Sequence, residues 1–138
     1  MANLVFICAS EGNNALLARE VEAHAVAMGH SVEHVSLNEY DFPIYTVARE
    51  KATPVLEGID RLVEVLDRGE AWFVFAPEYN GTCPPVLNNT IAWLSREGDD
   101  FRRLFRDRVV ALGTHSGGGG NHVIMAMRMQ FSFLGCVV

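Results

Sequence analysis

Three short polar segments carry the residues that could do chemistry, and each follows an apolar run. They read "ASEGNN" (9–14), "PEYNGTCPP" (77–85) and "THSGGGGNH" (114–122). None shows the spacing of His, Cys, Asp or Glu that is typical of metal ligands. Ser10 and Ser116 also lie outside the GxSxG turn that presents a nucleophilic serine. These segments therefore favour ligand binding by backbone groups, and we expect no catalytic side chain and no metal.

Segment 9–14 leads directly into a predicted helix. The free N–H groups and the positive dipole of a helix start form an anion site. Ser10, Asn13 and Asn14 add side-chain donors, and Gly12 allows close approach of the backbone. Glu11 would repel a phosphate if it pointed inward. An ordinary helix cap is the alternative interpretation.

Segment 77–85 has the composition of a rigid turn. Asn80 and Gly81 adopt left-handed backbone conformations readily, which exposes N–H groups. Pro84 and Pro85 fix the chain at the start of the next helix. With the ring of Tyr79 beside them, these groups suit a planar heterocycle with donors and acceptors along its edge.

Segment 114–122 contains four consecutive glycines, whose backbone is costly to order. Close approach to a flat ligand would explain them; a disordered or flexible surface loop is the alternative. His115 has no carboxylate partner nearby in the sequence, so we leave it outside the catalytic set.

The elements that must position these segments are four apolar runs at 3–8, 32–37, 71–76 and 108–114. Segments with helical periodicity separate them, which predicts βαβ units and a parallel sheet. Run 71–76 is apolar on both faces and suits a central strand, whereas run 32–37 carries polar residues and suits an edge.

Helices are expected at four places. The first covers residues 14–28, and the second follows Pro54 and holds Val55, Ile59, Leu62 and Leu66 before Gly69. The third holds Leu87, Ile91 and Leu94, and the fourth covers residues 121–134.

This order of elements predicts one domain, residues 1–138, with an α/β fold. It is a flavodoxin-like three-layer α/β/α sandwich with a parallel sheet of strand order 2-1-3-4-(5). The fifth strand is incomplete, with "CVV" at 136–138 as its first residues. Right-handed crossovers place the three polar segments on one rim of that sheet.

Composition excludes several classes of function. The chain has 138 residues, 49% of them hydrophobic, and a net charge of −6 without clustered Lys or Arg, which argues against nucleic-acid binding. The start lacks a basic leader and no apolar run reaches bilayer length, so we expect no membrane partner and a cytoplasmic location. Cys8, Cys83 and Cys136 lie far apart and are expected to be reduced.

The stretch "PEYNGTCPPVLNNTIAWLS" closely resembles the flavin-loop signature of the NADPH-dependent FMN reductase family, PEYN-G/x-S-x-P-x-x-L-K-N-A-x-D-W-L. "GTHSGGGG" is similar to that family's glycine-rich segment, and "AMRMQFSFLGCVV" resembles its fourth helix running into strand 5. Members have a flavodoxin-like fold, bind FMN, commonly form dimers or tetramers, and reduce small acceptors with NAD(P)H.

The resemblance implies that the isoalloxazine ring is lined, mainly through backbone groups, by Pro77, Glu78, Tyr79, Asn80 and Gly81. Ser116 and Gly117 would face its other side. In the phosphate loop Asn14 matches the family's N-x-x-L-A, but the family's longer GSxRxxSxN loop and its arginine are missing. The shorter loop is nearer in length to the S/T-x-T-G-x-T loop of flavodoxins.

The sequence and the resemblance together predict an FMN-dependent NAD(P)H oxidoreductase that reduces a flavin, a quinone or a similar small acceptor. The expected assembly is a homodimer or homotetramer. A flavodoxin-like electron carrier and a flavin-free scaffold or regulatory domain are the alternatives. No ribose-phosphate motif distinguishes NADH from NADPH.

Overall fold

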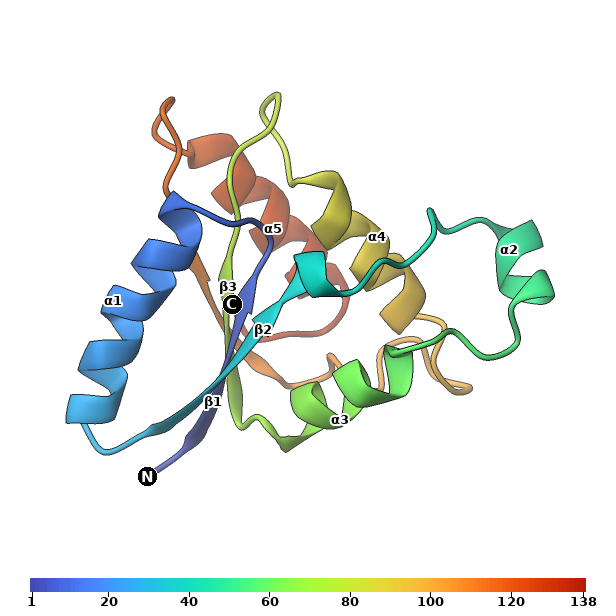
Figure 1. The fold of residues 1–138 in the computed structure, drawn as a ribbon, viewed down its shortest axis with the longest axis horizontal. Helices are drawn as coiled ribbons and strands as arrows, with labels where there is room; N and C mark the ends of the chain where they lie inside the picture. Colours follow the sequence, from blue (N-terminus) through green and yellow to red (C-terminus); the bar gives the residue numbers. More distant parts are fainter.

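The computed structural model describes residues 1–138, which form a parallel sheet between two helical layers (Figure 1). The strands are β1 (Asn3–Cys8), β2 (Ser31–Ser36), β3 (Ala71–Phe75) and β4 (Val109–Gly113). Their order is β2-β1-β3-β4, as predicted, so β2 is an edge strand and β3 is internal. The carboxyl ends of all four strands point to the same rim.

The helices are α1 (Asn13–Ala27), α2 (Val47–Ala52), α3 (Ile59–Arg68), α4 (Pro85–Leu94) and α5 (Asn121–Phe133), with a 3₁₀ turn η1 (Leu37–Glu39) after β2. Helix α1 lies on one face of the sheet, and α3, α4 and α5 cover the other (Figure 1). None of them combines the length and apolar character that crossing a membrane requires.

Strand β3 shows why the sheet needs cover on both faces. Trp72 and Val74, 1% and 0% exposed, pack with the helices α3 to α5. Phe73 and Phe75 point to the α1 side, where Phe6 stacks on Phe73 with ring centroids 4.7 Å apart. Alternate side chains of one strand thus enter two separate apolar layers, which fixes the register of the strand.

The second predicted helix corresponds to α3, which starts later than expected. It begins at Ile59, because Gly58 takes a left-handed conformation (φ 82°), and Val55 lies outside it and is 75% exposed. A separate helix, α2, precedes it and was not predicted. Its sequence has no apolar stripe, and it starts where Thr46 accepts a hydrogen bond from the N–H of Arg49 at 3.1 Å.

The residues after α5 return to the sheet beside β4. Val137 pairs with Val109 in a parallel bridge, and the N–H of Val110 donates to the carbonyl oxygen of Val137 at 2.8 Å. This is the position expected for the first residues of a fifth strand.

The three cysteines are buried and form no disulfide. Burial raises the pKa of Cys8 and of Cys83, and raises that of Cys136 to about 12. All three thiols therefore stay protonated near neutral pH, and none is an activated nucleophile.

A polar cluster fastens α2 to the rest of the molecule. The hydroxyl of Tyr45 donates to one oxygen of Glu50 at 2.7 Å, and Nε of Arg96 donates to the other at 2.9 Å. The hydrogen bond from Tyr45, followed by the one from Arg96, lowers the pKa of Glu50 below its ordinary value. The charged form of Glu50 is thus the form that the folded state favours.

We predict that this cluster makes the protein acid-sensitive. Because the folded-state pKa of Glu50 is depressed, its stabilisation is present above the unfolded-state pKa and is lost as the pH falls through the folded value. Urea unfolding should show a larger loss of stability between neutral pH and about pH 3 in the native protein than in Glu50→Gln. Glu64→Gln, at an exposed carboxylate without a hydrogen-bond partner, serves as the control and should behave like the native protein. Equal losses in all three proteins would contradict the prediction.

Candidate functional site

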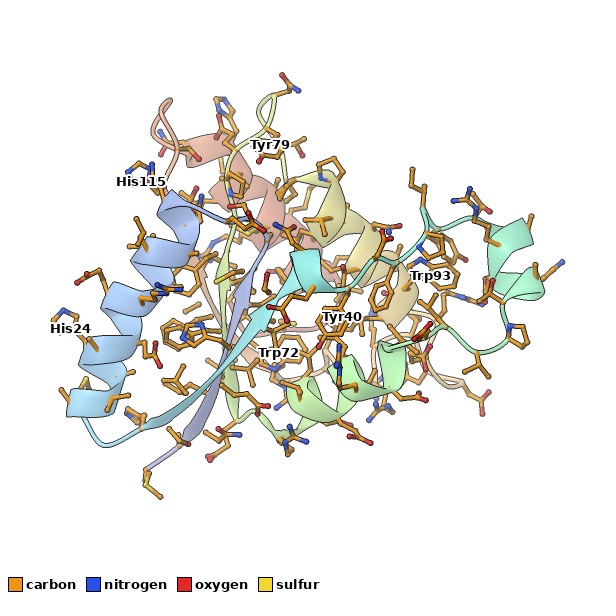
Figure 2. The ribbon with its side chains drawn as sticks, viewed as in Figure 1. His24, Tyr40, Trp72, Tyr79, Trp93 and His115 are labelled. Carbon is orange, nitrogen blue, oxygen red and sulfur yellow. The ribbon has the colours of Figure 1, made fainter.

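The three polar segments meet at the carboxyl rim of the sheet. They follow β1, β3 and β4, which are adjacent and parallel, so their loops emerge side by side. Figure 2 shows Tyr79 and His115 on neighbouring loops at this end of the molecule. The strand order β2-β1-β3-β4 changes its winding direction between β1 and β3, and ligands in such folds usually bind outside the carboxyl ends of the strands at that point.

The loop after β3 contains a tight hairpin. Tyr79 and Thr82 exchange two backbone hydrogen bonds of 3.1 Å. Between them Asn80 and Gly81 both have positive φ, 51° and 73°, as the sequence predicted. The N–H groups of these two residues have no acceptor within the protein. The hairpin therefore presents fixed, unused donors beside the half-exposed ring of Tyr79.

The carboxylate of Glu78 accepts hydrogen bonds from the start of α5. One of its oxygens accepts from the N–H groups of His122 and Val123 at 3.0 and 3.1 Å. Gly120 precedes this helix and has no side chain to cap it, so Glu78 acts as the cap from another loop. Its negative charge also complements the helix dipole.

Ser116 completes the connection between the same two loops. Its Oγ accepts the N–H of Glu78 at 2.8 Å and lies 3.1 Å from Oγ1 of Thr114. We expected Glu78 to face a ligand through its backbone, but this N–H is used inside the protein. Glu78 thus holds the two loops together through its N–H and its carboxylate, and its place beside the ring stays a prediction.

Asn14 ties the loop after β1 to the loop after β4. Its side chain is 3% exposed; Nδ2 donates to the carbonyl oxygen of His115 at 3.1 Å, and Oδ1 accepts the N–H of His115 at 2.8 Å. Sequence reasoning placed Asn14 among the donors to a ligand. In the structure its amide is a buried bridge that orders the glycine-rich loop, while the imidazole of His115 stays exposed.

The four glycines divide into two pairs. Gly119 and Gly120 have positive φ, 89° and 71°, and a Cβ on Gly120 would lie 2.4 Å from Cγ2 of Thr114. These two are required by the turn itself. A Cβ on Gly117 would meet nothing within 4 Å, and one on Gly118 would meet a single oxygen at 3.9 Å. Gly117 and Gly118 therefore form the part of the loop that a ligand can approach closely.

The start of α1 has free N–H groups of the kind that bind anions. Gly12 precedes the helix with φ 72° and gives it no side-chain cap, so the N–H groups of Asn13, Asn14 and Ala15 have no acceptor within the protein. Glu11 is exposed, and together with Ser10, Gly12 and Ala15 it lines a cleft between α1 and β2. The residues present thus suit a phosphate held by backbone N–H groups and a helix dipole, without a basic side chain.

A sequence model of the NADPH-dependent FMN reductases matches residues 2–138. The chain belongs to this family. Membership of this family gives FMN as the cofactor and NAD(P)H as the co-substrate. The anion site, the free donors of the hairpin and the open glycines suit the phosphate, the ring edge and the ring face of FMN respectively. No sequence among curated proteins matches this chain.

Solved structures of similar fold include several flavoproteins. FerB, a flavoenzyme NAD(P)H:(acceptor) oxidoreductase from Paracoccus denitrificans, has a TM-score of 0.82 at 20% identity; the match covers 99% of this chain and 74% of FerB. RosB with a bound 8-demethyl-8-formylriboflavin-5′-phosphate has a TM-score of 0.82 at 13% identity, covering 100% of this chain and 62% of RosB. The azoreductase AzrA has a TM-score of 0.70 at 19% identity, covering 99% of this chain and 83% of AzrA. These likenesses confirm the flavodoxin-like fold.

We predict that Glu78→Ala destabilises the protein by about 1–2 kcal/mol, because it removes the cap of α5 and leaves two backbone N–H groups without an acceptor. Urea unfolding measures the loss, and hydrogen exchange should show faster exchange at His122 and Val123. Glu64→Ala, at an exposed helical position, should cost much less. A Glu78 variant as stable and as protected as the native protein would show that the cap carries no energy.

Proposed function

We propose that this chain reduces a small acceptor, such as a flavin or a quinone, with electrons taken from NAD(P)H through bound FMN. The observation that carries the proposal is the set of unused backbone donors and open glycines on adjacent loops of the carboxyl rim. Family membership supports the same chemistry. Bound FMN would supply the capacity to accept and donate a hydride.

The protein's part in this chemistry is binding and orientation. The N–H groups of Asn80 and Gly81 would hold the polar edge of the ring and stabilise negative charge there. Gly117 and Gly118 would leave one ring face accessible. The start of α1 would bind the phosphate.

The ionisable side chains of these loops make structural contacts, which agrees with a binding role for the backbone. The carboxylate of Glu78 caps α5 and lies 3.4 Å from Nδ1 of His122, and both backbone groups of His115 are bonded to the side chain of Asn14. The proposal requires no side chain that moves a proton between substrates.

A larger side chain at Gly117 tests where the flavin ring binds. Because a Cβ on Gly117 meets no protein atom and its φ is not left-handed, Gly117→Val should fold normally. We expect it to weaken FMN binding about tenfold or more by occupying the space of the ring. Ser31→Val, at the opposite rim, should leave FMN affinity unchanged. Unchanged FMN affinity in a folded Gly117→Val would place the ring elsewhere.

Anaerobic addition of NADH or NADPH to the FMN-loaded protein, followed by visible absorbance, tests the reaction. We expect rapid bleaching and its reversal by a quinone. FMN binding without bleaching would contradict the reductase function and favour an electron carrier, and absence of FMN binding by folded protein would favour a flavin-free domain.

We also propose that the chain forms a homodimer through α4 and α5. An apolar groove of about 410 Å³ lies between these helices, and Met125, Met129 and Phe133 beside it are exposed. Sedimentation should show Met129→Glu as a monomer, whereas Met28→Glu, equally exposed at the end of α1, should assemble like the native protein. A native monomer, or a dimer unaffected by Met129→Glu, would exclude this face.

A further inference from the structure

Two histidine rings of this chain face a carboxylate, and one of the two pairs lies at the carboxyl rim. Glu22 faces His34 between α1 and β2. Glu78 faces His122, with its Oε1 3.4 Å from Nδ1 of the imidazole. Glu78 belongs to the loop after β3, and His122 lies in the first turn of α5. The second pair therefore joins the two loops that carry the unused donors and the open glycines.

Glu78 is held in place well enough to orient this ring. Its side chain is 14% exposed, and its own N–H donates to Oγ of Ser116. Its Oε2 accepts the N–H groups of His122 and Val123, whereas its Oε1 accepts no hydrogen bond from any other residue. The two oxygens thus have separate roles, because one caps α5 and the other faces the imidazole.

A carboxylate beside Nδ1 decides which ring nitrogen can take part in chemistry. Since an ionised carboxylate only accepts hydrogen bonds, Nδ1 of His122 carries its proton toward Glu78 in both the neutral and the charged ring. The separation of 3.4 Å is longer than an ideal hydrogen bond, as catalytic contacts often are before a ligand binds. The proton that His122 gains or loses is then the one on Nε2. This nitrogen has no partner within the protein, and the side chain is 73% exposed, so an incoming molecule can reach it.

The same carboxylate oxygen places His122 beside the open glycines. A Cβ on Gly118 would lie 3.9 Å from Oε1 of Glu78. Gly118 and the imidazole of His122 therefore border one oxygen atom. Because Gly118 is one of the two glycines proposed to leave a face of the flavin ring accessible, His122 lies next to the space through which an acceptor would reach that face.

His115, the other histidine of the glycine-rich loop, has no such arrangement. Its backbone groups are bonded to Asn14, but no carboxylate faces its ring. Sequence reasoning considered His115 and passed over His122. Glu78 and His122 are 44 positions apart, so no local pattern indicates the pair.

Reduction of a quinone to a hydroquinone consumes one hydride and one proton. Bound FMN, once reduced by NAD(P)H, supplies the hydride, which carries both electrons. The proton must reach an oxygen of the quinone. Water can deliver it, but a positioned general acid delivers it faster.

We propose that His122 is the catalytic proton donor to a quinone acceptor and that Glu78 is its positioning residue. The proposal rests on the proposed function, which places FMN and the acceptor at these loops. As the quinone is reduced and the flavin is oxidised, the N–H bond at Nε2 breaks and an O–H bond forms on the quinone. The imidazolium becomes a neutral imidazole and regains its proton from water.

Two acceptors test this step in rapid-mixing experiments on the reduced, FMN-loaded protein. Menadione, a quinone, needs a proton, whereas ferricyanide takes one electron per ion and needs none. Near neutral pH we expect His122→Gln to slow menadione reduction about tenfold or more and to leave ferricyanide reduction and bleaching by NAD(P)H unchanged. His24→Gln, exposed on α1 away from the rim (Figure 2), should match the native protein in all three reactions. A native menadione rate in His122→Gln, or an equal slowing with ferricyanide, would overturn the proposal.

The flavin-free protein gives a readout that does not depend on activity. ¹⁵N NMR of the imidazole at alkaline pH shows which nitrogen carries the proton in the neutral ring. We expect the Nδ1–H form for His122 in the native protein. In Glu78→Gln the new amide can donate to Nδ1, so the ring should change to the Nε2–H form. An Nε2–H form in the native protein would overturn the role of Glu78 and the orientation of His122.

The two experiments distinguish this proposal from the proposed function. Absence of bleaching by NAD(P)H would refute the reductase function and the proton donor with it. Bleaching together with a menadione rate that His122→Gln leaves unchanged would refute the proton donor alone.

Discussion

The hydrogen bonds that cross between loops are the constraint on which the site depends. The glycine-rich loop after β4 has few side chains with which to hold itself. Asn14 fixes it from the α1 side through both backbone groups of His115, and Ser116 and the α5 start fix it to Glu78 on the other side. Ordering this loop costs conformational entropy, and hydrogen bonds from the two neighbouring loops offset that cost.

Under the proposed function, this arrangement lets backbone groups make the site specific. Polar side chains at the rim are used to position backbone, and the backbone donors of the hairpin and of the α1 start are left unused for a ligand. Because the strands beneath are buried on both faces, these donors rest on a rigid base. Preorganised donors of this kind need no rearrangement when charge develops on a bound ring.

Much of the fold could be predicted because it depends on local patterns. The alternation of apolar runs predicted the strand order, and "NG" between Tyr79 and Thr82 predicted the left-handed turn. Helix α2 was missed because it has no apolar face, and the start of α3 was misplaced because Val55 happens to match its spacing. The bridge between Asn14 and His115 joins residues 101 positions apart, so no local pattern in the sequence indicates it. The sequence also could not distinguish the four consecutive glycines, of which two are required by the turn and two are open.

We propose that the flavin ring lies between the hairpin and the open glycines, with its phosphate at the start of α1. Amide chemical shifts of the ¹⁵N-labelled protein during an FMN titration test this residue by residue. We expect the largest shifts at Asn13, Asn80, Gly81, Gly117 and Gly118, with small shifts at the opposite rim. Shifts confined to other parts of the surface, with these five amides unmoved, would contradict the account.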